Sequence, residues 1–310
     1  MNSTLDNYLT NYTSLLSVSN DELSHLEIEG YVKLSRNEAF WKKHNIDINK
    51  FVTLAEDLII QENKKDSIRN DQNTYKPEKG ANRVSNLIGK NLDFKKFVAI
   101  PDILYLVNNV LRDNFRISSI DIREPLPNNG GQGLHLDWNQ RKNITDKYLQ
   151  CSAFIYLDDV NENNGPLRLI PKSHTEMFNV KSTSMYKEKR TKEDDEIISK
   201  YDTNKSIKIT ANRGDIVLLN MCVFHGGTTN ISGHRRRTIF INFRSSKVRQ
   251  QLNQFKYIKK ENHKYFSEIE KKILNLYNPS LKEVIKRFLY DNRKNQIIVS
   301  LNRFLSLFRS

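Results

Sequence analysis

Two histidines and an aspartate have the residue types and the order of a metal site. His135 and Asp137 are separated by one residue, and His225 follows far along the chain. On a β-strand alternate side chains share a face, so His135 and Asp137 would point the same way while Leu136 packs behind them. A histidine from a distant strand would complete a two-histidine, one-carboxylate facial triad, which leaves coordination positions of an octahedral metal open for reactants.

An arginine beyond the second histidine indicates what binds beside the metal. Arg236 lies in the run Arg235-Arg236-Arg237 at the start of an apolar strand. A buried guanidinium needs an anionic partner, and its fork matches a carboxylate in bidentate fashion. An iron-chelating 2-oxoacid with a second carboxylate would bridge the metal and Arg236. A period of two puts Arg235 and Arg237 on the opposite face, where both would stay solvated; the alternative is three surface arginines on an edge strand.

A His-x-Asp triplet is weak by itself, because a lone histidine on an apolar strand is usually hydrogen-bonded core. The context strengthens the interpretation. A turn at residues 128–131 would place His135 near the rim of a barrel, and His225 follows an apolar strand at residues 216–220.

Short β-branched or aromatic segments separated by turn residues predict a mainly β fold. The number of such segments favours a double-sheet jelly roll, the double-stranded β-helix, with flanking helices bracing one face. Residues 101–111 begin with Pro101 and have apolar residues at helical spacing, which predicts a helix. A helix start near Asn20 and a strand at residues 30–34 are expected before it. The expected core strands are residues 115–122, 132–137, 151–157, 167–170, 206–209, 215–220 and 237–243.

Two polar segments interrupt this pattern. Residues 62–80 hold almost no apolar side chains and predict a flexible loop, which is either a solvated connector or a carrier of substrate contacts. Residues 181–205 are strongly charged and predict an insertion between two core strands, either a lid over bound substrate or a solvated surface excursion.

Composition points to a globular protein with a basic extension. Of 310 residues, 37% are hydrophobic and 28% charged, and the net charge is +14. Residues 247–310 contain 15 Lys and Arg against 5 Asp and Glu, which gives +10 and leaves +4 for residues 1–246. With no leader-like N-terminus or long apolar stretch, and with Cys151 and Cys222 each in an apolar run, we expect a cytoplasmic protein with buried thiols.

This charge distribution divides the chain into a catalytic domain at residues 1–246 and a basic helical extension at residues 247–310. The extension has an apolar stripe at helical spacing, and another helix is expected after Asn278-Pro279-Ser280. The stripe would dock on the core or on a second subunit, or it would lie on an anionic membrane surface. Its members are Ile297, Ile298, Leu301, Phe304, Leu305 and Phe308.

Four stretches together resemble the phytanoyl-CoA dioxygenase family of Fe(II)/2-oxoglutarate-dependent oxygenases. They run in family order across roughly residues 20–246. They are residues 132–138, residues 164–174, residues 214–217, and residues 225–230 followed by Ser232 and Arg236.

The resemblance implies a double-stranded β-helix with Fe(II), 2-oxoglutarate and O2 as cofactor and cosubstrates. His135, Asp137 and His225 would then be the iron ligands, and Arg236 would bind the distal carboxylate of 2-oxoglutarate. The family usually has a serine two residues after the distal histidine, where this chain has Gly227, so we expect Thr228 to supply the hydroxyl that assists Arg236.

The resemblance also bears on neighbouring positions and on the type of reaction. Gln132 is expected beside the cosubstrate, Arg123, Trp138 and Asn139 are candidate substrate contacts, and His174 is expected to be structural. Related halogenases replace the metal-binding carboxylate with a small residue, so an aspartate at this position favours hydroxylation over chlorination.

The predicted function is hydroxylation of a small polar or anionic biosynthetic metabolite, with release of succinate and CO2. Desaturation, ring closure and epimerisation would need the same residues. A nucleic-acid dealkylase of the same superfamily is one alternative, but most of the positive charge lies in the extension and we expect no nucleic-acid partner. A non-catalytic metal-binding cupin or scaffold protein is another, and it would leave Arg236 unexplained.

Overall fold

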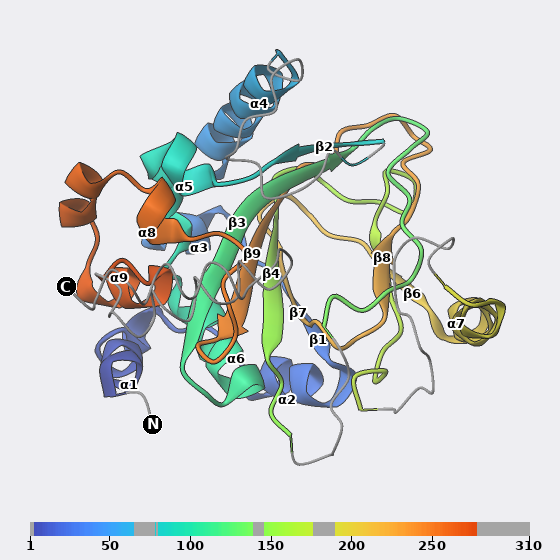
Figure 1. The fold of residues 1–310 in the computed structure, drawn as a ribbon, viewed down its shortest axis with the longest axis horizontal. Helices are drawn as coiled ribbons and strands as arrows, with labels where there is room; N and C mark the ends of the chain where they lie inside the picture. Colours follow the sequence, from blue (N-terminus) through green and yellow to red (C-terminus); the bar gives the residue numbers. More distant parts are fainter. Residues whose placement is uncertain (1–2, 65–77, 79, 139–145, 176–189, 278–310) are drawn as a thin grey trace, which may run out of the picture. The chain divides into compact units, whose positions relative to one another are not determined.

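Two antiparallel sheets form the centre of the structure, a computed structural model that describes residues 3–64, 78, 80–138, 146–175 and 190–277 (Figure 1). The larger sheet has the strand order β1 (Tyr31–Leu34), β7 (Ile216–Asn220), β4 (Gln150–Tyr156), β9 (Thr238–Ser245), β3 (Phe115–Pro125) and β2 (Ala81–Val84). The smaller sheet has the order β6 (Ile207–Ile209), β5 (Leu167–Leu169) and β8 (His225–Gly227).

Helices flank these sheets. The described α-helices are α1 (Ser3–Asn11), α2 (Asn20–Glu29), α3 (Glu38–Lys43), α4 (Ile48–Lys64), α5 (Leu87–Lys90), α6 (Pro101–Leu111), α7 (Lys192–Lys205), α8 (Gln254–Tyr257) and α9 (Glu268–Leu274). Short 3-10 helices occupy Thr13–Leu15, Leu92–Phe97 and Lys260–Tyr265. Helix α6 packs against β4, β7 and β9, and α9 packs against β3. Helix α7 lies beside the smaller sheet, on the side away from the larger one (Figure 1).

The space between the two sheets holds an apolar core. Phe154 and Tyr156 of β4 and Val217 and Leu219 of β7 pack with residues of β5 and β6, among them Leu167. Because successive side chains of a strand alternate between its faces, the neighbours of this core on the same face of the larger sheet lie two residues apart along each strand. Those positions supply the side chains of the cavity described below.

Most predicted elements are present. The helix expected at residues 101–111 has those bounds, because Pro101 stands at its first turn and its apolar face is buried on the sheet. Helix α2 begins at Asn20, one residue earlier than a cap at Asn20 would give, because Ser19 is the N-cap and forms a capping box with Glu22. The expected loop at residues 62–80 starts too early, since α4 continues to Lys64.

One expected strand is absent. Within residues 132–137 only His135 forms a β-bridge, and its partner is His225. The backbone N–H of Gln132 donates to Gly227 at 2.8 Å and that of Trp138 to Met221 at 3.2 Å. Gln132 is three residues from His135, whereas its partner Gly227 is only two residues from His225. The spacing on the two segments therefore differs, and a regular ladder does not form. Jelly-roll closure of the two sheets stays a prediction.

The first compact unit of the chain ends at a later residue than the charge pattern suggests. The first compact unit spans residues 1–275, so the chain between residues 247 and 275 belongs with the sheets and not with a separate basic domain. The apolar stripe at residues 297–308 and the helix expected after Asn278 lie outside the described residues. None of the helices in the described ranges has the length and apolarity needed to cross a bilayer.

The three consecutive arginines differ from expectation in one respect. Arg236 is buried, at 3% exposure, but Arg237 is buried as well and is not solvated. The Arg237 guanidinium donates to both carboxylate oxygens of Asp158, at 2.6 and 2.9 Å. Arg235 is 40% exposed and pairs with Glu56 and Glu124. The run precedes β9, an interior strand of its sheet, so the alternative of three surface arginines on an edge strand is wrong.

Replacing Arg237 with Ala should lower the free energy of unfolding by about 3–5 kcal/mol, because it leaves Asp158 buried without its cation. The measurement is urea unfolding at neutral pH. Lys42→Ala is the control, since Lys42 pairs with Glu38 on the surface with 72% of its side chain exposed, and it should change stability by less than about 1 kcal/mol. Equal losses in the two variants would contradict this role for Arg237.

Candidate active site

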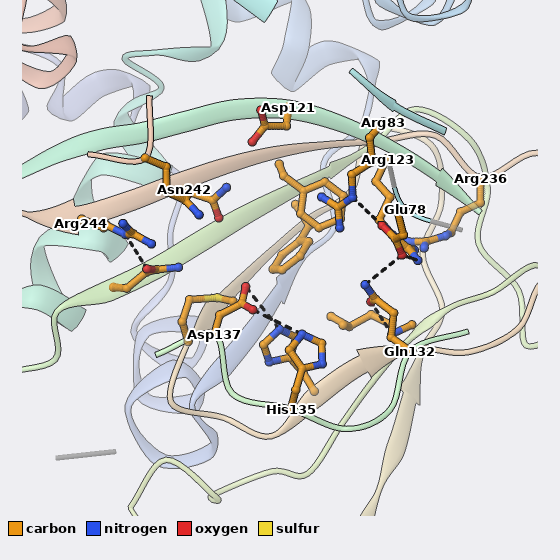
Figure 2. A pocket seen from close by; sticks show the side chains of 18 residues that line it. Glu78, Arg83, Asp121, Arg123, Gln132, His135, Asp137, Arg236, Asn242 and Arg244 are labelled. Atoms are coloured by element: carbon orange, nitrogen blue, oxygen red, sulfur yellow. Dashed lines mark hydrogen bonds and ion pairs between the residues drawn. The ribbon is translucent and has the colours of Figure 1, made fainter. Parts of the chain in front are cut away.

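His135, Asp137 and His225 come together as the sequence predicts. Their donor atoms all lie within 4.8 Å of one another, and this is a group of the kind that could hold a metal ion within the described residues. The Nε2 atom of His135 is 3.4 Å from one Asp137 oxygen, and that of His225 is 3.9 Å from the other. Figure 2 shows His135 and Asp137 close together at the wall of a cavity.

The backbone fixes the orientation of both imidazoles. Nδ1 of His135 lies 2.8 Å from the carbonyl oxygen of Gly133, and Nδ1 of His225 lies 2.8 Å from that of Val223. A carbonyl oxygen can only accept, so each Nδ1 carries a proton, and the Nε2 atom of a neutral imidazole then has its lone pair toward the cluster. Hydrogen bonds of this kind set the tautomer of metal-binding histidines.

The protonation states also suit a divalent cation. Burial lowers the pKa of His225 to about 4, with a further contribution from the adjacent His135, so the imidazole is neutral at pH 7. Burial alone would raise the pKa of Asp137, but the proximity of His135, and then of His225, outweighs it and holds that pKa well below its usual range. Two imidazoles and one carboxylate match the facial triad of non-haem iron.

Apolar packing behind the ligands holds their segment in place. Leu134 and Leu136 are buried in a cluster with Ile170, Phe224 and Ile198, so the side chains alternate as expected although no regular strand forms. Ile198 belongs to α7, within the insertion predicted at residues 181–205. Residues 181–189 of that insertion lie outside the described part, and its role as a lid stays a prediction.

The glycine after His225 allows the two ligand segments to approach. A Cβ on Gly226 would lie 2.9 Å from the carbonyl oxygens of both Gln132 and Gly133. A Cβ on Gly227 would lie 3.3 Å from the Nη1 of Arg123, so the space that a serine would use is taken by Arg123.

The ligands line a cavity of about 300 Å³ that extends to Arg236 (Figure 2). Within the described residues the Nε of Arg236 has no hydrogen-bond partner, and its Nη1 has only the Thr238 hydroxyl at 3.4 Å. Burial lowers the pKa of Arg236 to about 10, with the charge of Arg123 adding to the shift, so the guanidinium stays protonated at pH 7. A buried cation with an unused donor fits a carboxylate ligand.

A second unused donor belongs to Tyr156. Its hydroxyl is buried without a hydrogen-bond partner among the described residues, and burial raises its pKa to about 12. Tyr156 lies directly across β4 and β9 from Thr238, which contacts Arg236. The expected partner of Arg236, Thr228, instead donates its hydroxyl to the Pro166 carbonyl at 3.2 Å. Tyr156 is therefore better placed than Thr228 to assist Arg236.

A charged network surrounds this end of the cavity. Glu78 accepts from Arg123 at 2.6 Å, from Arg83 at 2.5 Å and from the Gln132 amide at 3.2 Å. Burial alone would raise the pKa of Glu78, but the hydrogen bond and charge of Arg123 lower it to about 2. With Arg236, three guanidinium groups face one carboxylate, so the local charge is positive and suits an anionic ligand.

The remaining predicted residues have mixed positions. Gln132 and Arg123 line the cavity. Trp138 is half-buried against the apolar core, with the Arg244 guanidinium carbon 5.1 Å from its ring centre. Asn139 lies outside the described residues. His174 is buried with Nε2 3.2 Å from the Glu27 carbonyl oxygen and is not part of the metal cluster, as expected of a structural histidine.

The sequence interpretation missed several residues of this cavity. Among them are Glu78, Arg83, Asp121, Gln150, Asn242, Arg244 and Gln251. The period of two along β3 and β9 could have revealed part of this set, since Asp121 shares a face with Arg123, and Asn242 and Arg244 follow Phe240 at two-residue steps.

A sequence model of the phytanoyl-CoA dioxygenase (PhyH) family matches residues 18–238. The chain belongs to the phytanoyl-CoA dioxygenase family. Its members use Fe(II), 2-oxoglutarate and O2, and the His135–Asp137–His225 cluster with Arg236 nearby has the donors for these groups. The protein is accordingly a 2-oxoglutarate-dependent non-haem iron oxygenase.

Solved structures share its fold at low sequence identity. SnoK, a non-haem α-ketoglutarate-dependent carbocyclase from nogalamycin biosynthesis, is 17% identical with a TM-score of 0.55, over 74% of this chain and 85% of SnoK. HygX from Streptomyces hygroscopicus, with nickel, 2-oxoglutarate and hygromycin B bound, is 14% identical with a TM-score of 0.56, over 75% and 90%. SnoN, an epimerase of nogalamycin biosynthesis, is 12% identical with a TM-score of 0.53, over 76% and 84%.

Arg236→Gln should weaken the binding of 2-oxoglutarate by at least about 30-fold, because removing one partner of a buried charge pair costs about 2 kcal/mol or more. Equilibrium dialysis of labelled 2-oxoglutarate with the Ni(II)-loaded protein measures this. Arg235→Gln removes the same charge one residue earlier, outside the cavity, and should bind as the wild type does. Equal affinity in the two variants would exclude Arg236 as the anchor.

Gly226→Ala should weaken metal binding about 10-fold or more, because the new methyl group displaces the carbonyl that orients His135. Isothermal titration with Ni(II) gives the affinity and the stoichiometry. An unchanged affinity would show that the close approach of the two segments is not needed for the site.

Proposed function

We propose that this oxygenase hydroxylates a C–H bond of a small polar or anionic biosynthetic metabolite, converting 2-oxoglutarate and O2 to succinate and CO2. The observation that supports hydroxylation is the Asp137 carboxylate, which lies within 4 Å of both ligand histidines. A chain adapted to halogenation would lack this carboxylate, because the halide takes its place on the metal.

His135, Asp137 and His225 would hold Fe(II) at one wall of the cavity, and Arg236 with Tyr156 would bind the distal carboxylate of 2-oxoglutarate. Bound Fe(II) supplies oxidative decarboxylation of the cosubstrate and activation of O2. Phe154 and Phe240, whose ring centres are 4.8 Å apart, line the cavity between its two polar ends.

A non-catalytic metal-binding cupin or scaffold protein is a weaker candidate, because burying Arg236 without an anionic ligand to offset its desolvation would cost free energy. Ring closure and epimerisation use the same cofactors in SnoK and SnoN. The mass of the product separates these reactions: hydroxylation adds one oxygen atom, ring closure by C–H oxidation removes two hydrogens, and epimerisation leaves the mass unchanged.

His225→Ala should abolish succinate release from 2-oxoglutarate, because the cluster loses one of its two imidazoles. The assay uses purified protein with Fe(II), 2-oxoglutarate and ascorbate, with and without a metabolite mixture. His234→Ala is the matched control, since His234 is exposed and outside the cluster, and it should retain wild-type release. Undiminished release by His225→Ala would remove the assignment.

A further inference from the structure

The cavity has a second polar end, opposite Arg236. Three neighbouring strands build it, and their register aligns the side chains in rows across the same face. Gln150 of β4 lies opposite Arg244 of β9, and Asn242 of β9 lies between Ser152 of β4 and Ser119 of β3. In Figure 2 Arg244 and Asn242 lie on one side of the metal cluster and Arg236 lies on the other.

Arg244 is held in a fixed orientation at this end. Its Nε donates to the Gln150 side-chain oxygen at 2.7 Å, and its Nη1 donates to the Arg249 carbonyl at 3.0 Å. The guanidinium carbon lies 5.1 Å from the ring centre of Trp138, within cation–π range. Gln150 itself is 2% exposed. An oriented guanidinium that lines a cavity presents a fixed positive charge to an oxyanion, and little side-chain entropy remains to be lost on binding.

The residues around Arg244 are also oriented. The Asn242 amide donates to Ser119 at 2.9 Å, and its oxygen accepts from Ser152 at 2.6 Å. Gln251, in the segment after β9, also lines the cavity. Its backbone N–H donates to the Ser118 hydroxyl at 2.8 Å. Asn242, Arg244 and Gln251 all lie beyond residue 238, where the family match ends. Three of the residues at this end therefore come from outside the matched family sequence, while Gln150, Ser152 and Ser119 come from within it.

Charge varies along the cavity. Asp121 lies opposite Phe240, four residues before Arg244 on β9 or about 14 Å along the strand, so its carboxylate is well separated from Arg244. The order of charges is a cation at Arg236, an acid at Asp121 and a cation at Arg244. An anionic group is therefore favoured at Arg244 and disfavoured in the middle, beside the Asp121 carboxylate.

We propose that Arg244 is a specificity-determining residue that binds an anionic group of the primary substrate, a carboxylate or a phosphate, and so directs the reacting part of that molecule toward the metal cluster. This inference rests on the proposed function, because it assigns the substrate class of the same site. The Arg236 end is reserved for the cosubstrate, so the substrate anion and the 2-oxoglutarate anion occupy opposite ends.

The test is anion binding without turnover. Full-length protein loaded with Ni(II) and saturating 2-oxoglutarate is titrated with inorganic phosphate and, separately, with propionate. Fluorescence of Trp138 reports on Arg244, while the other tryptophan, Trp41, is buried at 2% exposure. The wild type should show a saturable change with one of the two anions, and the responding anion distinguishes a phosphate from a carboxylate substrate.

Arg244→Gln should weaken that binding about tenfold or more. Gln150→Glu places an internal carboxylate beside Arg244 and should weaken it too, so the test does not depend on one variant folding. Lys247→Gln is the matched control, because Lys247 lies three residues after Arg244, is exposed and pairs with Asp113. The titration of this variant should equal that of the wild type.

Identical titrations of wild type and Arg244→Gln, or no saturable response of the wild type to either anion, would overturn the inference. Because the titration involves no turnover, its failure is separable from that of the proposed function. Protein that binds anions through Arg244 but never releases succinate would refute the oxygenase reaction and leave the anion site standing.

Discussion

The site depends on one pair of backbone contacts between residues far apart in sequence. His135 donates its N–H to the carbonyl of His225 at 2.8 Å, and His225 returns the bond at 3.0 Å. Residues that exchange both hydrogen bonds in this way have their side chains on the same face, which places the imidazole ring centres 4.5 Å apart. Asp137 then reaches the cluster two residues later. The metal ligands are brought together by this bridge and not by a continuous strand.

The surrounding structure supports that bridge. Strand β8 carries His225 and pairs with β5, so one histidine is fixed within the smaller sheet. The His135 segment has no sheet of its own, and it is held by the apolar cluster of Leu134 and Leu136 and by the close approach at Gly226. Near this bridge, a buried donor of Arg236 and the buried hydroxyl of Tyr156 have no hydrogen-bond partner among the described residues. A ligand with a carboxylate would satisfy both.

The sequence predicted what depends on local pattern and motif. Helix α6 was predictable end to end because Pro101 and the apolar spacing are local signals, and the ligand set followed from residue types in family order. The exposure of Arg237 was not predictable, because its partner Asp158 comes from a distant part of the chain. Glu78 was hidden for the same reason: it lies in a polar stretch, and only the folded chain brings it to Arg123. Arg244 was within reach of the period-two argument, but nothing local shows that Gln150 orients it.

The most direct test of the account is anomalous diffraction from crystals grown with Mn(II) and 2-oxoglutarate under anaerobic conditions. The account predicts one metal peak per chain, coordinated by Nε2 of His135, Nε2 of His225 and one Asp137 oxygen, with the free carboxylate of 2-oxoglutarate against Arg236. A metal peak on other residues, or 2-oxoglutarate bound with its distal carboxylate away from Arg236, would contradict it.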